Sequence, residues 1–469
     1  KLDEFPGSYE NALPYRNQGI AARVTYGFKD TYFFESNIGY NGSENFAPGH
    51  RFGLFPSAAI GYLISNEKFF KPILPVVSML KFKASYGLAG NDQISETKRF
   101  AFNATMQNHG SFNWGESGGT SYTGLSVGYP GNNNVGWEEA KKLNIGAEIE
   151  FFNSLKIQAD YFNERRNGIF VERASVPSIV GVMVNPYLNL GQMKNQGVEF
   201  SVEYHKRIGE VDLSGRANFT FSRNIKLYDD APAPKYDYMN PIGKPLRNNN
   251  RFVLVSAGYF KDEEDIANSP VQQYGEVRPG DRKFKDINGD GIVNDYDRVA
   301  MGYTDLPEIN YGFGLSAVWK SFDISVFFQG VGNTTGVMDG NPINGFESDL
   351  FLTSNLYEDL ALNHWSLANP DPDAKYPRLS SSRNENNKQL CTGKLYNASF
   401  LRLKNAEIGY TLPKSILKKM HMKNCRFYLQ GVNLLTFAPF KLWDPEITNS
   451  QGATYPNMRT VSLGLNVNF

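Results

Sequence analysis

The last residues of the chain alternate strictly between apolar positions and polar or glycine positions. Val461, Leu463, Leu465, Val467 and Phe469 are apolar, and each residue between them is polar or glycine. Because successive side chains of a β-strand point to opposite faces, this pattern predicts a strand with one apolar and one polar face. The alternative is that these residues form an edge strand of a soluble β-sandwich. This alternative is less favourable because the strand would then end on an exposed Phe.

The same two-residue period recurs along the whole chain. In residues 322–329 the single exception is Phe327, which falls on the polar face. We predict about 13 strands on this period. They lie near residues 17–29, 31–42, 53–64, 79–90, 136–151, 154–170, 195–206, 211–225, 308–319, 321–332, 396–411, 425–436 and 457–469.

Short and long connections alternate between these strands. Turns are expected at 29–30, 153–154, 208–209 and 320–321, and long segments at 91–135, 171–194, 227–307 and 333–395. Two linkers on the short-turn side, 65–78 and 413–424, are expected to form small helices or caps. This layout is typical of outer-membrane β-barrels with long extracellular loops. An odd strand count does not close an antiparallel barrel, so the chain is interpreted as part of one.

Composition supports a membrane β-structure and argues against several other classes of protein. Aromatic residues make up 14% of the chain and there are 44 glycines, which suits the aromatic girdles of a membrane barrel. No apolar run is long enough for a transmembrane helix. Lys and Arg total 48, and Asp and Glu also total 48. The chain therefore lacks the net positive charge that would indicate a nucleic-acid partner. Cys391 and Cys425 predict neither a disulfide framework nor a metal site.

Eight internal segments and the terminal strand carry a set of motifs in a fixed order. They are YNGSENFAPGHRFGLFPS (40–57), LKFKASYGLAGND (80–92), NLGQMKNQGVEF (189–200), FKDINGDG (284–291), ASFLRL (398–403), GYTLP (409–413), QGVNLL (430–435) and WDPE (443–446). In these motifs the chain resembles SusC/RagA-type TonB-dependent outer-membrane transporters, over essentially its whole length. The resemblance implies an all-β, transmembrane antiparallel β-barrel. Residues 1–469 would supply the final strands, about 13, of a 22-stranded barrel, and residues 227–307 a long extracellular loop region.

The resemblance also implies a function and partners. It implies a Bacteroidota-type outer-membrane protein, surrounded by lipid, that imports glycan oligosaccharides or peptides with energy from TonB. A SusD-like surface lipoprotein would act as the lid. TonB would act through an N-terminal part that is missing here, and the plug and the remaining strands of the barrel would be further partners. Two other classes of function remain open: a passive porin or structural surface barrel, and a secreted calcium-stabilised β enzyme.

The enzyme alternative is less favoured because a glycoside hydrolase needs a paired-carboxylate site, and the sequence singles out no such pair. We therefore predict no enzymatic activity, no catalytic residues and no cofactor-binding residues. Loop aromatic residues are candidates for contact with substrate or a partner protein, because sugar rings and protein partners both pack on such faces. These candidates are Trp114, Tyr122, Trp137, Trp365 and Trp443.

One segment has the spacing of a calcium-binding loop. Hard oxygen ligands at alternate positions of a tight turn are what Ca²⁺ requires. The candidate ligands are Asp286, Asn288, Asp290, the carbonyl of Ile292, Asn294 and Asp297, with Gly291 at the sharp turn. Asp297 occupies the position where Glu is usual, which shortens its reach. We expect a structural calcium ion here, and the alternative is an acidic Asn/Gly turn without metal.

Overall fold

The computed structural model of the chain describes residues 14–94, 99–115, 119–181, 183–246, 252–344, 356–380, 384–447, 452 and 454–469. Within these residues the main element is a sheet of 13 strands, which confirms the predicted strands. In sheet order they are β1 (Asn17–Phe28), β2 (Tyr32–Ser43), β3 (Phe52–Leu63), β4 (Val77–Asn91), β7 (Glu138–Phe151), β8 (Leu155–Glu172), β9 (Tyr187–Ile208), β10 (Val211–Tyr228), β17 (Ile309–Trp319), β18 (Phe322–Gly332), β21 (Phe400–Thr411), β22 (Asn424–Phe437) and β23 (Thr460–Asn468).

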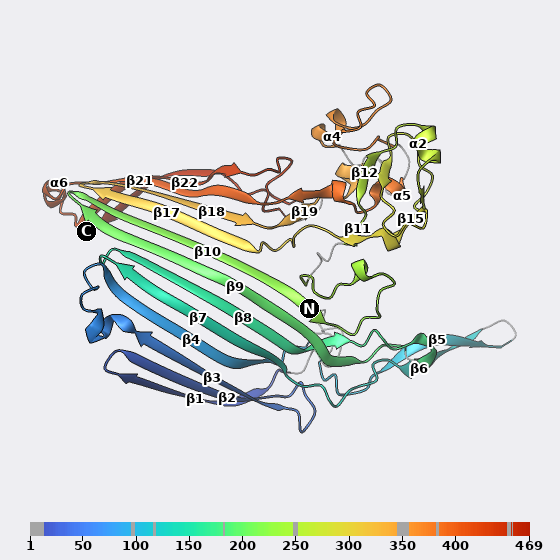
Figure 1. Cartoon of the computed structure of the whole chain (residues 1–469), viewed down its shortest axis with the longest axis horizontal. Coiled ribbons are helices and arrows are strands. Elements are labelled where there is room, and N and C mark those ends of the chain that lie inside the picture. The colour runs from blue at the N-terminus through green and yellow to red at the C-terminus, as the bar shows by residue number, and fades with distance from the viewer. Residues whose placement is uncertain are drawn as a thin grey trace. The chain divides into compact units, whose positions relative to one another are not determined.

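The chain divides into two compact units. The first consists of residues 1–200, 222–233 and 242–244, and the second of residues 201–221, 234–241 and 245–469. In the first unit, strands β1 to β4 and β7 to β8 pair antiparallel with their neighbours in sequence order. In the second unit, β10, β17, β18, β21, β22 and β23 do the same. Their long ribbons run side by side in Figure 1.

The predicted short turns are confirmed by their backbone conformation. Lys29 and Asp30 have φ of 54° and 51°, Lys320 has φ of 55°, and Gly209 has φ of 60°. Positive φ at the central residues matches the right-handed twist of the two strands that a tight hairpin joins. The two linkers are confirmed as small helical elements: η1 (Ile64–Asn66), η2 (Lys68–Phe70) and α6 (Lys414–Lys419). No helix within the described residues is both long and apolar enough to cross a membrane.

Two of the predicted long segments are more regular than expected. Residues 91–135 contain a hairpin, β5 (Met106–Trp114) with β6 (Thr120–Val127), in an antiparallel register with a bulge between Asn108 and Ser111. Strand β9 starts at Tyr187, so 171–194 is not one long loop. The Asn189 amide explains the earlier start, since it donates to the carbonyls of Gly136 and Gly168.

Much of the predicted long loop region at 227–307 folds into short strands and helices. We call residues 252–300, together with the described residues of 356–397, the loop assembly. It gathers at one end of the second unit's long strands in Figure 1, with α6 at the other end. Its elements are β11 (Phe252–Val253), β12 (Ser256–Tyr259), α2 (Glu263–Ala267), β13 (Val271–Gln272), β14 (Arg282–Phe284), β15 (Ile292–Val293), η6 (Asp295–Asp297), β16 (Val299–Ala300), α4 (Glu358–Leu362), α5 (Glu385–Lys388), η7 (Thr392–Lys394) and β20 (Leu395–Asn397).

Each unit has its own small apolar cores. In the second, Leu254, Phe284, Val293 and Cys391 form the core of the loop assembly. A second cluster joins Met338, Ile343, Tyr396 and Ala398 near β19 (Thr335–Val337) and α3 (Asn341–Asn344). In the first, Phe46, Ile94, Ala101, Tyr129 and Val135 pack beyond the ends of the strands. The remaining short elements are η4 (Ser178–Val180) and η5 (Asp237–Met239).

Candidate functional site

The long strands expose their apolar side chains. On β23, Val461, Leu463 and Leu465 are 64%, 83% and 58% exposed. In the first unit, the polar face of the strands is instead only partly exposed and is cross-linked by charge: the Lys83 ammonium lies 3.1 Å from Asp160 and 3.5 Å from Glu148. A soluble protein has the opposite arrangement, so this sheet requires an apolar environment on one face.

Aromatic side chains cluster at the short-turn ends of the strands. In the first unit, the rings of Tyr32 and Tyr62 stack with their centroids 5.0 Å apart. In the second, Phe322 and Tyr410 lie 4.8 Å apart. Amphipathic aromatic residues favour the level of the lipid headgroups. Together with the exposed apolar face, these clusters have the form of an interfacial girdle.

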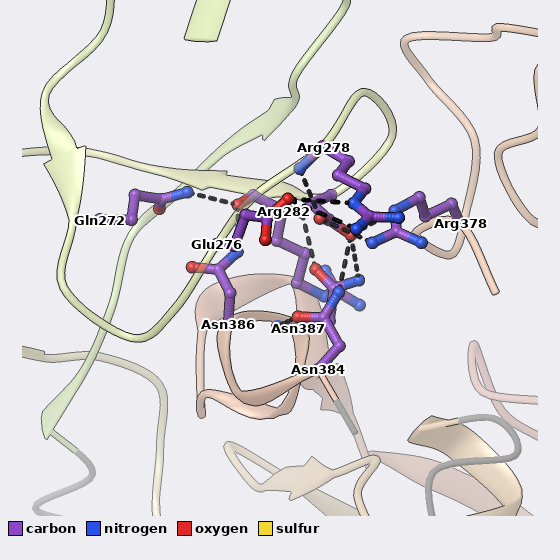
Figure 2. A network of polar contacts seen from close by, with 9 residues as sticks. Gln272, Glu276, Arg278, Arg282, Arg378, Asn384, Asn386 and Asn387 are labelled. Carbon is purple, nitrogen blue, oxygen red and sulfur yellow. Dashed lines mark hydrogen bonds and ion pairs between the residues drawn. The ribbon is translucent and has the colours of Figure 1, made fainter. Parts of the chain in front are cut away.

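At the other end of the second unit, a buried carboxylate holds the loop assembly together. Asp281 is fully buried, and one of its oxygens accepts hydrogen bonds from the side-chain amides of Asn384 and Asn387, both at 2.8 Å. The Arg378 guanidinium binds the same carboxylate, with a nitrogen–oxygen distance of 2.8 Å. Figure 2 shows Arg378, Asn384 and Asn387 converging on this point. Two chain segments about a hundred residues apart are thereby joined into one folded surface.

The neighbouring backbone is held in the same way. The Asn387 amide oxygen accepts from the Arg282 backbone N–H at 2.8 Å, while the Arg282 carbonyl accepts from Gln272 and Asn386. Buried backbone groups at the end of a short strand would otherwise lack partners, and each would cost free energy. Sequence reasoning missed this network, because no local pattern marks its members. The only available signal was the run of three asparagines and an acid at 384–387.

The predicted calcium-binding segment forms a tight acidic turn in the loop assembly. Asp286 accepts hydrogen bonds from the backbone N–H groups of Gly289 and Gly291, at 2.7 and 2.8 Å. Asp297 is fully buried and accepts from the N–H groups of Ile287 and Asn294. The carboxylates are thus oriented by the loop's own backbone.

The remaining predicted ligands also have backbone partners. Asn288 accepts from the N–H of Asp290, and Asp290 accepts from the N–H of Ile292, at 2.8 and 2.9 Å. Asn294 caps η6 by accepting from Tyr296. Throughout the described residues, no three His, Cys, Asp or Glu side chains come together as a metal-binding group. The Ile292 carbonyl and the asparagine oxygens would therefore have to complete any coordination shell.

The structure separates the five aromatic candidates into two kinds. Trp114 and Tyr122 lie on the β5–β6 hairpin and are 62% and 60% exposed. Trp365 is almost fully buried, and Trp443 packs in the cluster around Tyr396. Trp137 packs against Phe46 and Phe55, and its indole N–H donates to the Arg51 carbonyl. Of the five, only the hairpin pair is largely exposed, while Trp137 and Trp443 are half-buried.

The hairpin exposes further apolar side chains besides Trp114 and Tyr122. Met106, Phe112, Leu125 and Val127 on the same two strands are each at least half exposed, and the Phe112 and Trp114 rings lie edge to face with centroids 5.1 Å apart. A protruding hairpin with so much exposed apolar surface is typical of a protein-docking element.

An exposed apolar strand face, an ion-paired polar face and interfacial aromatic residues define the class: a transmembrane β-sheet protein of the outer-membrane type. Comparison with known proteins agrees. A family model described as "TonB dependent receptor-like, beta-barrel" matches residues 4–311. The chain belongs to the TonB-dependent receptor β-barrel family, and it has the barrel fold and outer-membrane location of that family.

Individual relatives give a finer picture. TonB-dependent receptor P3 of Formosa agariphila is 28% identical, over 99% of this chain and 46% of its own length. TonB-dependent receptor SusC of Bacteroides thetaiotaomicron is 26% identical, over 95% of this chain and 43% of its own length. The RagAB peptide importer in its "open-open" state superposes with a TM-score of 0.77 at 25% identity, covering 97% of this chain and 47% of that chain. The chain spans about half the length of the curated relatives it matches.

Proposed function

We propose that this chain is the barrel portion of a TonB-dependent importer of oligomeric nutrients, either glycan oligosaccharides or peptides. The observation that supports this most strongly is the similarity over nearly the whole chain to the receptors named SusC and P3. The structural similarity to a complex described as a peptide importer supports peptides as one substrate class. The protein would carry out no bond chemistry.

We propose further that the importer works with a SusD-like surface lipoprotein. The exposed apolar hairpin β5–β6, with Trp114 and Tyr122 at its surface, is the element best suited to bind it. The loops and the lipoprotein would capture the substrate. TonB would then supply energy through the part of the transporter that lies outside this chain, displacing a plug from the barrel.

We also propose that the acidic turn at 286–297 holds a structural calcium ion. The support is the regular alternation of Asp and Asn oxygens around a turn whose backbone already orients them. Terbium luminescence, excited through the nearby Tyr296, tests this proposal on the purified transporter. We expect calcium to quench the signal and Asp290→Asn to abolish it. Equal luminescence in Asp290→Asn would contradict the proposal.

A passive porin is the competing function, and growth experiments separate the two. A strain that lacks the gene is grown on a panel of oligosaccharides and peptides as sole nutrients, at concentrations near the limit for growth. If the protein is an energy-coupled importer, the strain that lacks the gene should grow poorly on one substrate class. The intact gene should restore this growth, but not in a strain from which TonB has also been deleted. Restoration that is independent of TonB would favour the porin.

A further inference from the structure

A row of polar side chains crosses the second unit's strands at one level. Pairing places Ser214 opposite Ser316, Ser316 opposite Ser325, and Ser325 opposite Glu407. Directly paired residues in neighbouring strands project from the same face of the sheet. The Ser214 and Ser316 hydroxyls are 2.6 Å apart. These small side chains form the floor of a pocket of about 460 Å³ on the polar face.

The next row explains why Phe327 lies on the polar face. Pairing places Arg216 opposite Gly314 and Gly314 opposite Phe327. A Cβ atom on Gly312 or Gly314 would lie 3.0 or 2.9 Å from the Phe327 ring, so the ring lies over the space that these glycines leave. The Arg216 guanidinium then stacks over Phe327, with its carbon 5.3 Å from the ring centroid.

No described residue of the chain neutralises the charge of Arg216. Among the described residues no carboxylate forms an ion pair with it, and its side chain is exposed at the pocket. The one carboxylate that lines the pocket, Glu407, is bound by Arg426, which also holds Asp323. A guanidinium fixed on an aromatic ring presents its N–H fork in a preformed orientation, which suits the two oxygens of a carboxylate.

We propose that this pocket binds a carboxylate group through Arg216, with the serine hydroxyls and the amide of Asn405 available as further donors. Two sources would present this chemistry. One is an acidic residue or sugar acid in the transported oligomer, and in this form the inference rests on the proposed function. The other is an acidic side chain of the part of the transporter outside this chain.

Calorimetric titration of the whole detergent-purified transporter tests the proposal. The probes are glutarate and its uncharged analogue glutaramide. We expect glutarate to bind at least tenfold more tightly than glutaramide, and Arg216→Gln to lose at least tenfold in glutarate affinity. Arg216→Lys should retain part of it, because the charge remains but the fork does not. Arg207→Gln removes a similar exposed charge outside the pocket and should change nothing. Equal glutarate binding in wild type and Arg216→Gln would overturn the proposal.

If the wild type binds neither probe, a high-resolution structure of the whole transporter decides the matter. A carboxylate from the rest of the protein within hydrogen-bonding distance of Arg216 would identify the internal source, and Arg216 without a carboxylate would refute the proposal. Binding is measured here without transport. Tight, Arg216-dependent glutarate binding by a protein that does not import would therefore refute the proposed function alone.

Discussion

The Arg402 guanidinium, whose side chain is 1% exposed, donates to both Asp444 oxygens, the nearer at 2.6 Å. Arg402 also reaches Glu446 at 3.1 Å. The pairing joins β21 to the segment that follows β22, and it links the sequence segments FLRL (400–403) and WDPE (443–446).

Removing the ion pairs of Arg402 should destabilise the protein. Arg402→Met leaves two partly buried carboxylates beside each other without a counter-charge, so we expect the free energy of unfolding to fall by about 3–5 kcal/mol. Urea titration of the heat-modifiable band in detergent measures this change. Arg23→Met removes a cation from an exposed pair with Glu35 and should cost about 1 kcal/mol or less. Equal losses in the two variants would contradict this account.

Gly280 should be intolerant of a side chain. Its φ is +86°, and a Cβ atom there would lie 2.1 Å from a ring carbon of the buried Trp365. We expect Gly280→Ala to destabilise the loop assembly by roughly 2–4 kcal/mol, through overpacking and backbone strain together. Gly258→Ala is the matched control, since its φ is +95° with no atom within 4 Å. Limited proteolysis measures how readily the loop assembly is cleaved in each variant. Cleavage of Gly258→Ala as fast as Gly280→Ala would contradict the prediction.

The loop assembly should respond to acid through Asp265. The hydrogen bond from the Lys283 ammonium, 2.7 Å away, lowers the pKa of Asp265 below its ordinary 3.8. A carboxyl with a lowered folded-state pKa stabilises the fold above pH 3.8, and that stability is lost as the pH falls from there through the folded pKa. Hydrogen exchange of residues 262–269 should therefore accelerate below pH 3.8.

The Lys283→Gln variant isolates this contribution from that of other carboxylates. We expect it to exchange faster than wild type at neutral pH and to show a shallower acid dependence. The effect should be small because both side chains are about a quarter exposed. An acid profile identical to that of wild type would show that the pair contributes nothing to stability.

The β5–β6 hairpin should govern capture of the lipoprotein. Trp114→Ala combined with Tyr122→Ala removes two exposed rings of the kind that dominate protein interfaces, and we expect at least a tenfold weaker association. Native mass spectra of the detergent-extracted complex measure this ratio. Asn113→Ala, on the same exposed strand, should leave the association unchanged. Full retention of the lipoprotein in the double variant would place the interface elsewhere.

The strands could be predicted from the sequence because alternation is a local property. In β18 apolar and polar residues alternate from Phe322 to Val326, and Phe327 departs from this pattern because its ring lies over the space that Gly312 and Gly314 leave on β17. The hairpin β5–β6 was missed because its apolar residues fall out of phase between Tyr122 and Leu125 and because its register is interrupted by a bulge.

The loop assembly lay beyond local reasoning for a different reason. Asp281 is fixed by Asn384 and Asn387, which lie 103 and 106 residues away in the chain. No period or turn signal connects such positions. The burial of Trp365 follows from the same long-range fold, so its exclusion from ligand contact could not have been foreseen from its place in a loop.

Uptake of a labelled oligomer by intact cells, with and without a protonophore, tests the central claim most directly. The substrate is the one on which the deletion strain fails to grow. We predict saturable uptake that requires the gene and is abolished when the proton gradient is dissipated. Gene-dependent uptake that continues undiminished with the gradient collapsed would mean that this barrel is a passive pore.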